Sequence, residues 1–208
     1  IGAATKLITQ LDDLSTNNLN LVSNTSFEPQ TLASTQNNLN LINFSGTYLE
    51  NLSYTMGNTC SFFVVSNVAP LVTNAAQSLF SYDDVASSND FQLDAGSATQ
   101  FNPRINGGIL SSAANASTPP YQGSFKVYHL RLNRNTNAAS LLIDDQVKIN
   151  VFYANDLSSG NSNFRLASNR AVSQFLINDF AEAIIIDGDV SASKSTEIYN
   201  YLKGKWNI

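Results

Sequence analysis

Cysteine is nearly absent from this sequence, which carries a single thiol at Cys60. An intrachain disulfide is therefore excluded. Cys60 lies just before the apolar run at 62–65, and we expect it to be a small, buried apolar residue. A catalytic thiol would need His129 as its base, because the chain has no other histidine.

Charge is scarce as well: charged residues make up 13% of the chain, against about 25% in typical globular proteins. The formal net charge is −5. Sequence-independent nucleic-acid binding needs a basic face, and the only cationic cluster is Lys126, Arg131 and Arg134. We interpret this cluster as a solvated strand face and expect no nucleic-acid partner.

Long apolar runs are missing too. No stretch approaches the roughly 18 apolar residues of a membrane-spanning helix, so we expect no membrane span. No secretory signal peptide is seen and the chain begins at Ile1, so we expect a processed chain or a fragment.

What the sequence does have is the composition of a β protein. Apolar residues make up 43% of it, with 12 Phe and 8 Tyr, and turn signals recur roughly every ten residues from 40 to 190. The clearest polar–apolar alternation covers 124–133 and predicts a strand with a bulge near Tyr128. These patterns predict an all-β, two-sheet antiparallel sandwich that forms one domain over 1–208, with 1–14 as an irregular arm or one or two helical turns.

The last quarter of the chain carries the strongest local signals. Four consecutive apolar residues at 183–186 predict a central strand that is covered on both faces. Ser191 or Ser193 can cap a helix of about two turns. Its predicted apolar face is Ile198, Tyr201 and Leu202, followed by Trp206, the only tryptophan, as an anchor.

This ending resembles the closing signature of laminin-G-like jelly rolls in the concanavalin A-like lectin/glucanase superfamily. The resemblance rests on Phe180-Ala181-Glu182-Ala183-Ile184-Ile185-Ile186 and on Tyr199-Asn200-Tyr201-Leu202-Lys203-Gly204-Lys205-Trp206. The opening is similar as well, through residues 12–20, Pro29 and Leu41-Ile42-Asn43-Phe44-Ser45-Gly46, where Ser45 replaces the usual Asp. The resemblance implies a jelly roll with a short C-terminal helix.

Glucanases of this superfamily use several acids on one face of a strand, and retaining hydrolysis needs two carboxyl groups about 5 Å apart. The four glutamates of this chain, Glu28, Glu50, Glu182 and Glu197, have no acid partner at i+2 or i+4 on a predicted strand. Asp179 and Glu182 are expected on opposite faces. We therefore predict no catalytic residue, a hydrogen-bonding structural role for Glu182, and a hydrogen-bonded or exposed His129.

Metal and sugar sites have weaker signals. Calcium could use Asp144-Asp145, Asp187 with Asp189, or Asp83-Asp84 with Asp90, but none has EF-hand spacing, so we expect solvated carboxylates and no metal or other cofactor. Sugar binding could use Tyr82, Tyr121, Tyr128 or Tyr153 as aromatic platforms. No ligand-binding residue is assigned.

Fold alone does not fix function. Our first hypothesis is a non-enzymatic structural or adhesion module of a virion, such as a capsid decoration, fibre or tail, or of a cell-surface assembly. Its partners would be other copies or subunits of that assembly and glycans, at an extracellular or virion surface. The alternatives are a free carbohydrate-binding lectin, with or without calcium, and then a divergent glycoside hydrolase.

Overall fold

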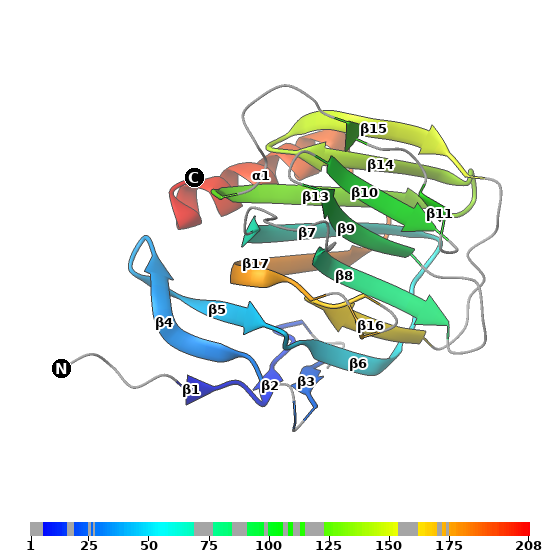
Figure 1. The fold of residues 1–208 in the computed structure, drawn as a ribbon. Helices are drawn as coiled ribbons and strands as arrows, with labels where there is room; N and C mark the ends of the chain where they lie inside the picture. The colour runs from blue at the N-terminus through cyan, green and yellow to red at the C-terminus, as the bar shows by residue number, and fades with distance from the viewer. Residues whose placement is uncertain are drawn as a thin grey trace.

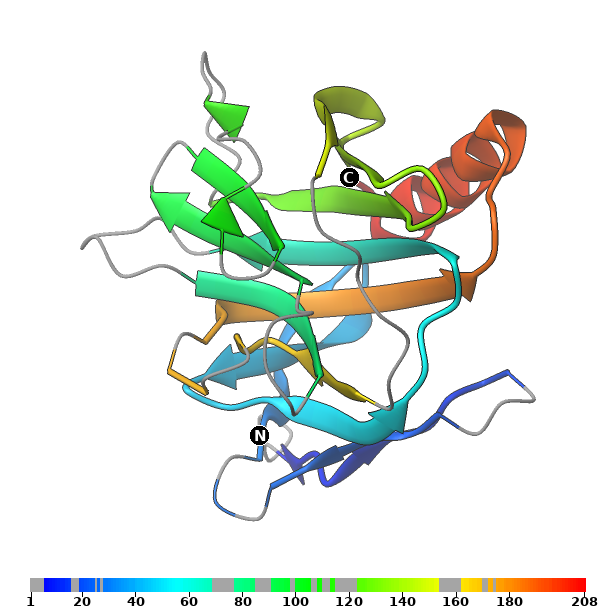
Figure 2. The same ribbon diagram turned by 90° about the vertical axis from the view of Figure 1, so that its right-hand side faces the viewer.

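The protein is a sandwich of two antiparallel sheets with one helix at its C-terminal end, as the two views of the computed structural model show (Figures 1 and 2). The structure describes residues 6–15, 19–24, 26, 28–68, 77–84, 91–97, 100–105, 108–109, 113–114, 123–153, 162–169, 172–173 and 175–208. The predicted all-β class and C-terminal helix are confirmed.

The first sheet contains eight strands in the order β1-β4-β5-β17-β7-β13-β14-β15. Their bounds are β1 Lys6–Leu7, β4 Gln30–Gln36, β5 Leu39–Ser45, β17 Ile177–Asp187, β7 Thr59–Val68, β13 Phe125–Asn133, β14 Ala138–Ile143 and β15 Gln146–Phe152. As predicted, the last strand of the chain lies inside the sheet, between β5 and β7.

The second sheet contains nine strands, eight of them in the order β11-β10-β9-β8-β16-β6-β3-β2, with β12 also paired to β10. Their bounds are β11 Gly108–Ile109, β10 Gln100–Ile105, β9 Phe91–Ser97, β8 Gln77–Asp84, β16 Ser162–Leu166, β6 Leu49–Tyr54, β3 Leu21–Ser23, β2 Gln10–Leu11 and β12 Ala113–Ala114.

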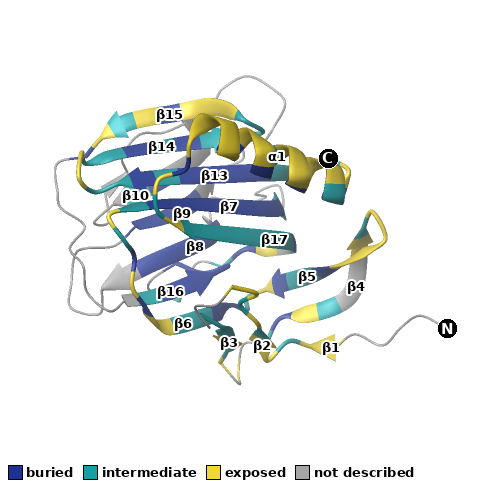
Figure 3. Cartoon of the chain, turned by 180° about the vertical axis from the view of Figure 1, so that it is seen from behind, coloured by how far each residue is buried: buried dark blue, intermediate teal, exposed yellow. Residues whose placement is uncertain are grey.

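Aromatic rings fill the space between the two sheets. Phe62 of the first sheet lies 5.2 Å from Phe80 and 5.1 Å from Phe91 of the second, measured between ring centroids. Such contacts add about 0.5–1.5 kcal/mol per pair to the benefit of burial. In Figure 3 most of β7, β8 and β13 is accordingly dark blue, β17 is teal, and β1 and much of β15 are exposed.

The bulge predicted near Tyr128 is wrong. β13 pairs with β7 in one unbroken register from Phe125 to Asn133. Its two faces are both buried, because Tyr128 and Leu130 face the second sheet while Val127 packs under the helix. A strand covered on both sides loses the simple alternation that the prediction assumed.

The helix α1, Ala192–Trp206, is 15 residues long, about twice the predicted length. The Ser191 hydroxyl accepts a hydrogen bond from the backbone N–H of Lys194 and caps it, as predicted. Ile198, Leu202 and Trp206 are buried against the outer face of the first sheet (Figure 3). Tyr201 is wrongly predicted to be buried, since it is 51% exposed.

The helical alternative for the N-terminal arm is wrong. Within the described part of 1–14, residues 6–7 and 10–11 form β1 and β2, which pair with β4 and β3 respectively. The arm therefore adds one short strand to each sheet. One or two turns of helix would be unstable alone in water, whereas both short strands gain partners that are already in place.

Candidate functional site

A cleft of about 710 Å³ opens between the two sheets beside β17. Its lining comes mainly from residues 11–15 after β2, from 51–55 at the end of β6, and from 182–187 of β17. Apolar side chains of the core, among them Leu21 and Phe180, also contribute. The three segments are far apart in the sequence: β3 links β2 to β6 in the second sheet, and the packing of the two sheets brings β17 of the first sheet beside them.

One wall of the cleft is the backbone edge of β17. This strand pairs with β7 from Asn178 to Asp187, but it pairs with β5 only from Ile177 to Phe180. Residues 182–185 all line the cleft, although successive side chains of a strand point to opposite faces. The strand backbone itself therefore forms the wall, with alternate N–H and C=O groups on its unpaired side.

The predicted cover on both faces of 183–186 is confirmed, because Ala183 and Ile185 pack against the core between the sheets and Ile184 and Ile186 pack against the cluster under the helix. Ala181 to Ile186 are all only half-buried, because β5 turns away from β17 after the paired segment (Figure 1). The β4–β5 hairpin instead reaches the helix end, where Gln36 Nε2 donates to the Trp206 carbonyl at 2.9 Å and Asn37 Nδ2 to the Lys205 carbonyl at 2.8 Å.

Glu182 ties this unpaired stretch to the helix. Its carboxylate accepts hydrogen bonds from Trp206 Nε1 at 2.7 Å and from the Tyr201 hydroxyl at 3.3 Å, and it forms a 2.9 Å ion pair with Lys205. The predicted hydrogen-bonding role of Glu182 is confirmed, with the helix as its partner.

The predicted separation of Asp179 and Glu182 onto opposite faces is wrong. A register shift against β7 between Phe180 and Glu182 inserts a bulge at Ala181, which reverses the side-chain phase after it. Asp179 accepts from Asn43 Nδ2 at 3.0 Å, on the helix side of the sheet, where Glu182 also lies.

Acidic side chains surround the cleft. Asp12 accepts from Gln10 Nε2 at 2.6 Å, and Asp13 accepts from the backbone N–H groups of Ser15 and Leu19. The Leu19 N–H above all, followed by the groups of Ser15, lowers the pKa of Asp13. Among the lining residues that the structure describes there is no Lys, Arg or His.

Asp187 closes one end of the cleft. Its Oδ1 accepts from the Gly57 N–H at 2.8 Å and from the Cys60 thiol at 3.4 Å. A Cβ at position 57 would overlap this carboxylate, so only glycine permits the contact. Burial, and then the Asp187 charge, raise the pKa of Cys60. The predicted burial of Cys60 is confirmed at 2% exposure, and its thiol is poorly suited to nucleophilic catalysis.

Tyr54 lines the cleft next to Asp187 and is 4% exposed. Its ring packs against Tyr82 and Phe164, with centroids 5.8 and 5.7 Å away. Its hydroxyl has no hydrogen-bond partner among the described residues. Burial above all raises the pKa of Tyr54, which keeps the phenol neutral. A buried hydroxyl without a partner is costly in a protein core.

Three of the four tyrosines considered as sugar platforms are too buried for that role. Tyr82, Tyr128 and Tyr153 are at most 6% exposed and belong to the core between the sheets. Tyr121 lies outside the described residues. Among the described side chains the most exposed aromatic is Phe152 of β15, at 82%, which the sequence did not single out because it alternates like any strand residue.

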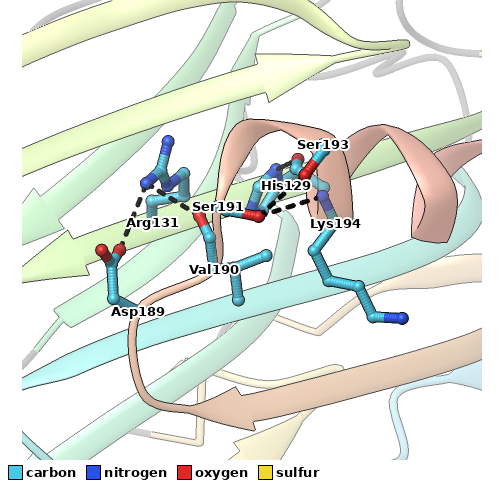
Figure 4. A network of polar contacts seen from close by, with 8 residues as sticks. His129, Arg131, Asp189, Val190, Ser191, Ser193 and Lys194 are labelled. Atoms are coloured by element: carbon cyan, nitrogen blue, oxygen red, sulfur yellow. Dashed lines mark hydrogen bonds and ion pairs between the residues drawn. The ribbon is translucent and has the colours of Figure 1, made fainter.

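His129 lies under the start of the helix, away from the cleft (Figure 4). It is 4% exposed, stacks on Phe63 at 3.7 Å between centroids, and shares a 3.3 Å hydrogen bond with the Ser195 hydroxyl through Nδ1. Burial above all, and then the Arg131 charge, lower the pKa of His129 to about 3. The predicted hydrogen-bonded strand histidine is confirmed.

No Ser–His–acid triad forms around His129 within the described part of the chain. Its Nε2 has no hydrogen-bond partner there, and Asp189 contacts Arg131 at 3.5 Å instead (Figure 4). The other predicted surface cations are also engaged: Lys126 pairs with Asp144 at 2.8 Å, and Arg134 donates to backbone carbonyls.

The calcium candidates do not converge. No group of three or more His, Cys, Asp or Glu that could hold a metal ion occurs among the described residues. Asp144 and Asp145 form a hairpin turn with positive φ angles of 50° and 62°, and Asp90 lies outside the described residues.

Within the described part of the chain, no helix has the length and apolar character that a membrane span requires.

A buried polar pair on the outer face of the second sheet was missed by sequence reasoning. Asp94, fully buried, pairs with Arg104 at 2.8 Å and accepts from Gln92 Nε2 at 2.7 Å. Burial, opposed by these partners and by Ser78, raises the pKa of Asp94 to about 6. Residues 92 and 104 face each other across β9 and β10, a pairing that local patterns do not reveal.

No protein-family model matches the chain, and no curated protein matches it in sequence. Solved structures do match. A GH54 α-L-arabinofuranosidase aligns over 97% of this chain and 52% of its own, with a TM-score of 0.73 and 12% identity. The binding domain of Paraclostridial Mosquitocidal Protein 1 aligns over 96% of this chain and 54% of its own, with a TM-score of 0.68 and 13% identity.

Domain 4 of AbnA, a GH43 extracellular arabinanase from Geobacillus stearothermophilus solved with arabinotriose, aligns over 95% of this chain and all of its own, with a TM-score of 0.65 and 14% identity. This chain thus spans about half the length of the first two structures and the whole of the third. At these identities the likeness shows the fold alone, a sandwich of two antiparallel β sheets.

Proposed function

We propose that this chain is a non-enzymatic carbohydrate-binding module and that the cleft beside β17 is its glycan site. The observation that carries the proposal is the composition of the cleft. A volume of about 710 Å³ lies within the roughly 300–1,000 Å³ of small-ligand sites. Its apolar floor suits the C–H faces of a sugar ring, and its strand edge and carboxylates suit the hydroxyl groups.

The structural neighbours support this class of ligand. The domain that aligns over its whole length was solved with arabinotriose and belongs to an extracellular arabinanase. The first structure is an arabinofuranosidase, and the toxin domain is named a binding domain. Membership of the laminin-G/concanavalin A-like superfamily, an extracellular location and one domain over 1–208 are parts of the same proposal.

The non-enzymatic part rests on the placement of the acids. Glu182 is already bonded to three groups of the helix. Asp187 follows it by five positions on one strand, which corresponds to roughly 17 Å. Glycoside hydrolysis needs two carboxyl groups about 5–9.5 Å apart, so these two acids of β17 do not form such a pair. Incubation with polysaccharides, followed by analysis of reducing sugar, should therefore detect no release.

A module of a virion or cell-surface assembly stays a prediction. The comparisons favour a glycan-binding domain, which such an assembly can use for adhesion, and they include no virion protein among the structures named above. Native mass spectrometry on the purified chain tests whether it assembles with further copies.

The glycan site can be tested with variants that fill the cleft. Ser53→Trp places a large ring at the exposed rim, and Ala183→Trp places one at the floor. We expect both to abolish binding to glycans that the wild type retains on an array, with affinity then measured by calorimetry. Phe152→Ala on distant β15 is the control and should bind normally. If that control loses binding while Ser53→Trp keeps it, the sugar stacks on Phe152 and the cleft is not the site.

A further inference from the structure

We propose that the cleft selects uncharged or amine-bearing sugars and excludes acidic ones. This inference rests on the proposed glycan-binding function and adds the chemical class of the ligand. It follows from two features described above, the charges around the cleft and the strand edge that forms its wall.

The charges around the cleft have one sign. Three carboxylates line it, from Asp12, Asp13 and Asp187, and the described lining contains no cationic side chain. Glu182 contributes its backbone to the wall, while its carboxylate lies on the helix side and pairs with Lys205 at 2.9 Å. A uronic or sialic acid would bring a carboxylate among them without the Arg or Lys that recognises such groups elsewhere.

Two of these acids have acceptor capacity to spare. Asp12 uses Oδ1 for Gln10, and Asp187 uses Oδ1 for both Gly57 and Cys60. Among the described residues, the Oδ2 atom of each has no hydrogen-bond partner. These atoms can accept from sugar hydroxyls, and an ammonium group would gain the charge as well. Asp13 differs, because both of its oxygens are occupied by Ser15 and Leu19, and it contributes charge alone.

The unpaired edge of β17 supplies the donors that the side chains lack. In an antiparallel strand the N–H and C=O of one residue point to the same side. Each exposed residue of the edge therefore offers one donor beside one acceptor. A hydroxyl, which donates and accepts, matches this pair. A carboxylate, which only accepts, would meet a carbonyl oxygen next to every N–H, so the edge does not compensate for the missing cations.

The size of the discrimination follows from Coulomb's law. Two like charges about 7 Å apart in water weaken binding by about threefold. Three such pairs give roughly twentyfold in affinity between a neutral glycan and its acidic analogue at low salt. Salt at 0.5 M shortens the screening length to about 4 Å and should remove most of the difference.

The test is a glycan array with matched pairs. One pair is a glucosamine trimer with and without N-acetyl groups, and another is a galacturonate trimer with and without methyl esters, among common neutral and sialylated glycans. We expect binding to neutral and amine-bearing members, at least tenfold tighter than to any acidic counterpart. Tighter binding to the acidic members would overturn this inference and leave glycan binding intact. An array with no bound glycan would overturn the proposed function, and this inference with it.

Charge variants link the selectivity to the cleft. Asp12→Asn combined with Asp187→Asn should reduce the preference for the neutral member by about sevenfold. Asp12→Asn alone, which leaves the Gly57 contact intact, should reduce it by about threefold. Glu197→Gln removes an equal charge from the exposed helix surface, where Glu197 pairs with Lys194, and should change nothing. An unchanged preference in both cleft variants, or an equal change in Glu197→Gln, would refute the role of these acids.

Discussion

Acid should destabilise this protein through His129 more than through any surface group. The imidazole is buried at 4% exposure under the helix, with a pKa of about 3. An unfolded chain binds the proton with the ordinary pKa of about 6.5. Below pH 6.5 the unfolded state is therefore protonated first, and the free energy of unfolding falls as the pH decreases from 6.5 towards 3.

The size of this effect can be worked out at pH 5. That pH lies about 1.5 below the ordinary pKa, and each pKa unit corresponds to about 1.4 kcal/mol, so His129 should cost about 2 kcal/mol of stability there. Asp94 acts in the opposite direction. Its pKa of about 6 exceeds the ordinary 3.8, so the folded state binds its proton first and gains stability as the pH falls from 6 to 3.8. The effect of His129 must therefore be measured against a variant.

His129→Gln is the matched variant, because its amide can still bond to the Ser195 hydroxyl but does not titrate. Urea unfolding followed by the fluorescence of Trp206, the single tryptophan, gives the free energy for both proteins at pH 7.5, 6 and 5. The wild type should be more stable at pH 7.5, where the variant loses the stacking on Phe63. Its advantage should shrink by about 2 kcal/mol at pH 5. Parallel curves for the two proteins would refute the reasoning, since the histidine would then be free to protonate in the folded state.

Three further predictions concern single side chains. Glu182→Ala should lower the free energy of unfolding by about 2–3 kcal/mol in urea titrations, because Trp206 Nε1 loses its acceptor, whereas Glu197→Ala should change it by less than about 0.5 kcal/mol. As the pH falls from 6 to 4, the wild type should gain up to about 3 kcal/mol of stability relative to Asp94→Asn, measured by the same urea titrations. A wild type without that gain would contradict the raised pKa of Asp94. Cys60 should resist a thiol reagent at pH 8 in the folded protein and react at once in urea, because burial raises the pKa of its thiol; rapid labelling without denaturant would contradict the burial.

The sequence predicted strands well where polar and apolar residues alternate or where four apolar residues follow one another. β7 and β13 are of this kind, and the cap at Ser191 is a local signal of the same quality. The predictions failed where the outcome depended on a distant partner. The bulge at Ala181 and the loss of β5 pairing after Phe180 are decided by how β7 and the β4–β5 hairpin meet β17, and no window around residue 181 contains that information.

The site was less predictable than the fold. The cleft combines segments near residues 12, 53 and 185, so its existence depends on sheet order and not on any motif. Individual acids such as Asp187 were visible, but as calcium candidates, because adjacent carboxylates suggest a cation. The tyrosines suggested sugar platforms for their chemistry alone, and Tyr82 and Tyr128 proved to be core residues because strand alternation turned them inward.

The central position of β17 has a consequence for biosynthesis. A ribosome delivers this strand after more than 170 residues of the chain, and until then β5 and β7 have no neighbour between them. Both strands expose backbone edges during this interval, and β7 also exposes the run Phe62 to Val65. Such edges pair readily with other chains. The nascent protein should therefore depend on chaperones or low temperature for soluble expression until β17 emerges and completes the sheet.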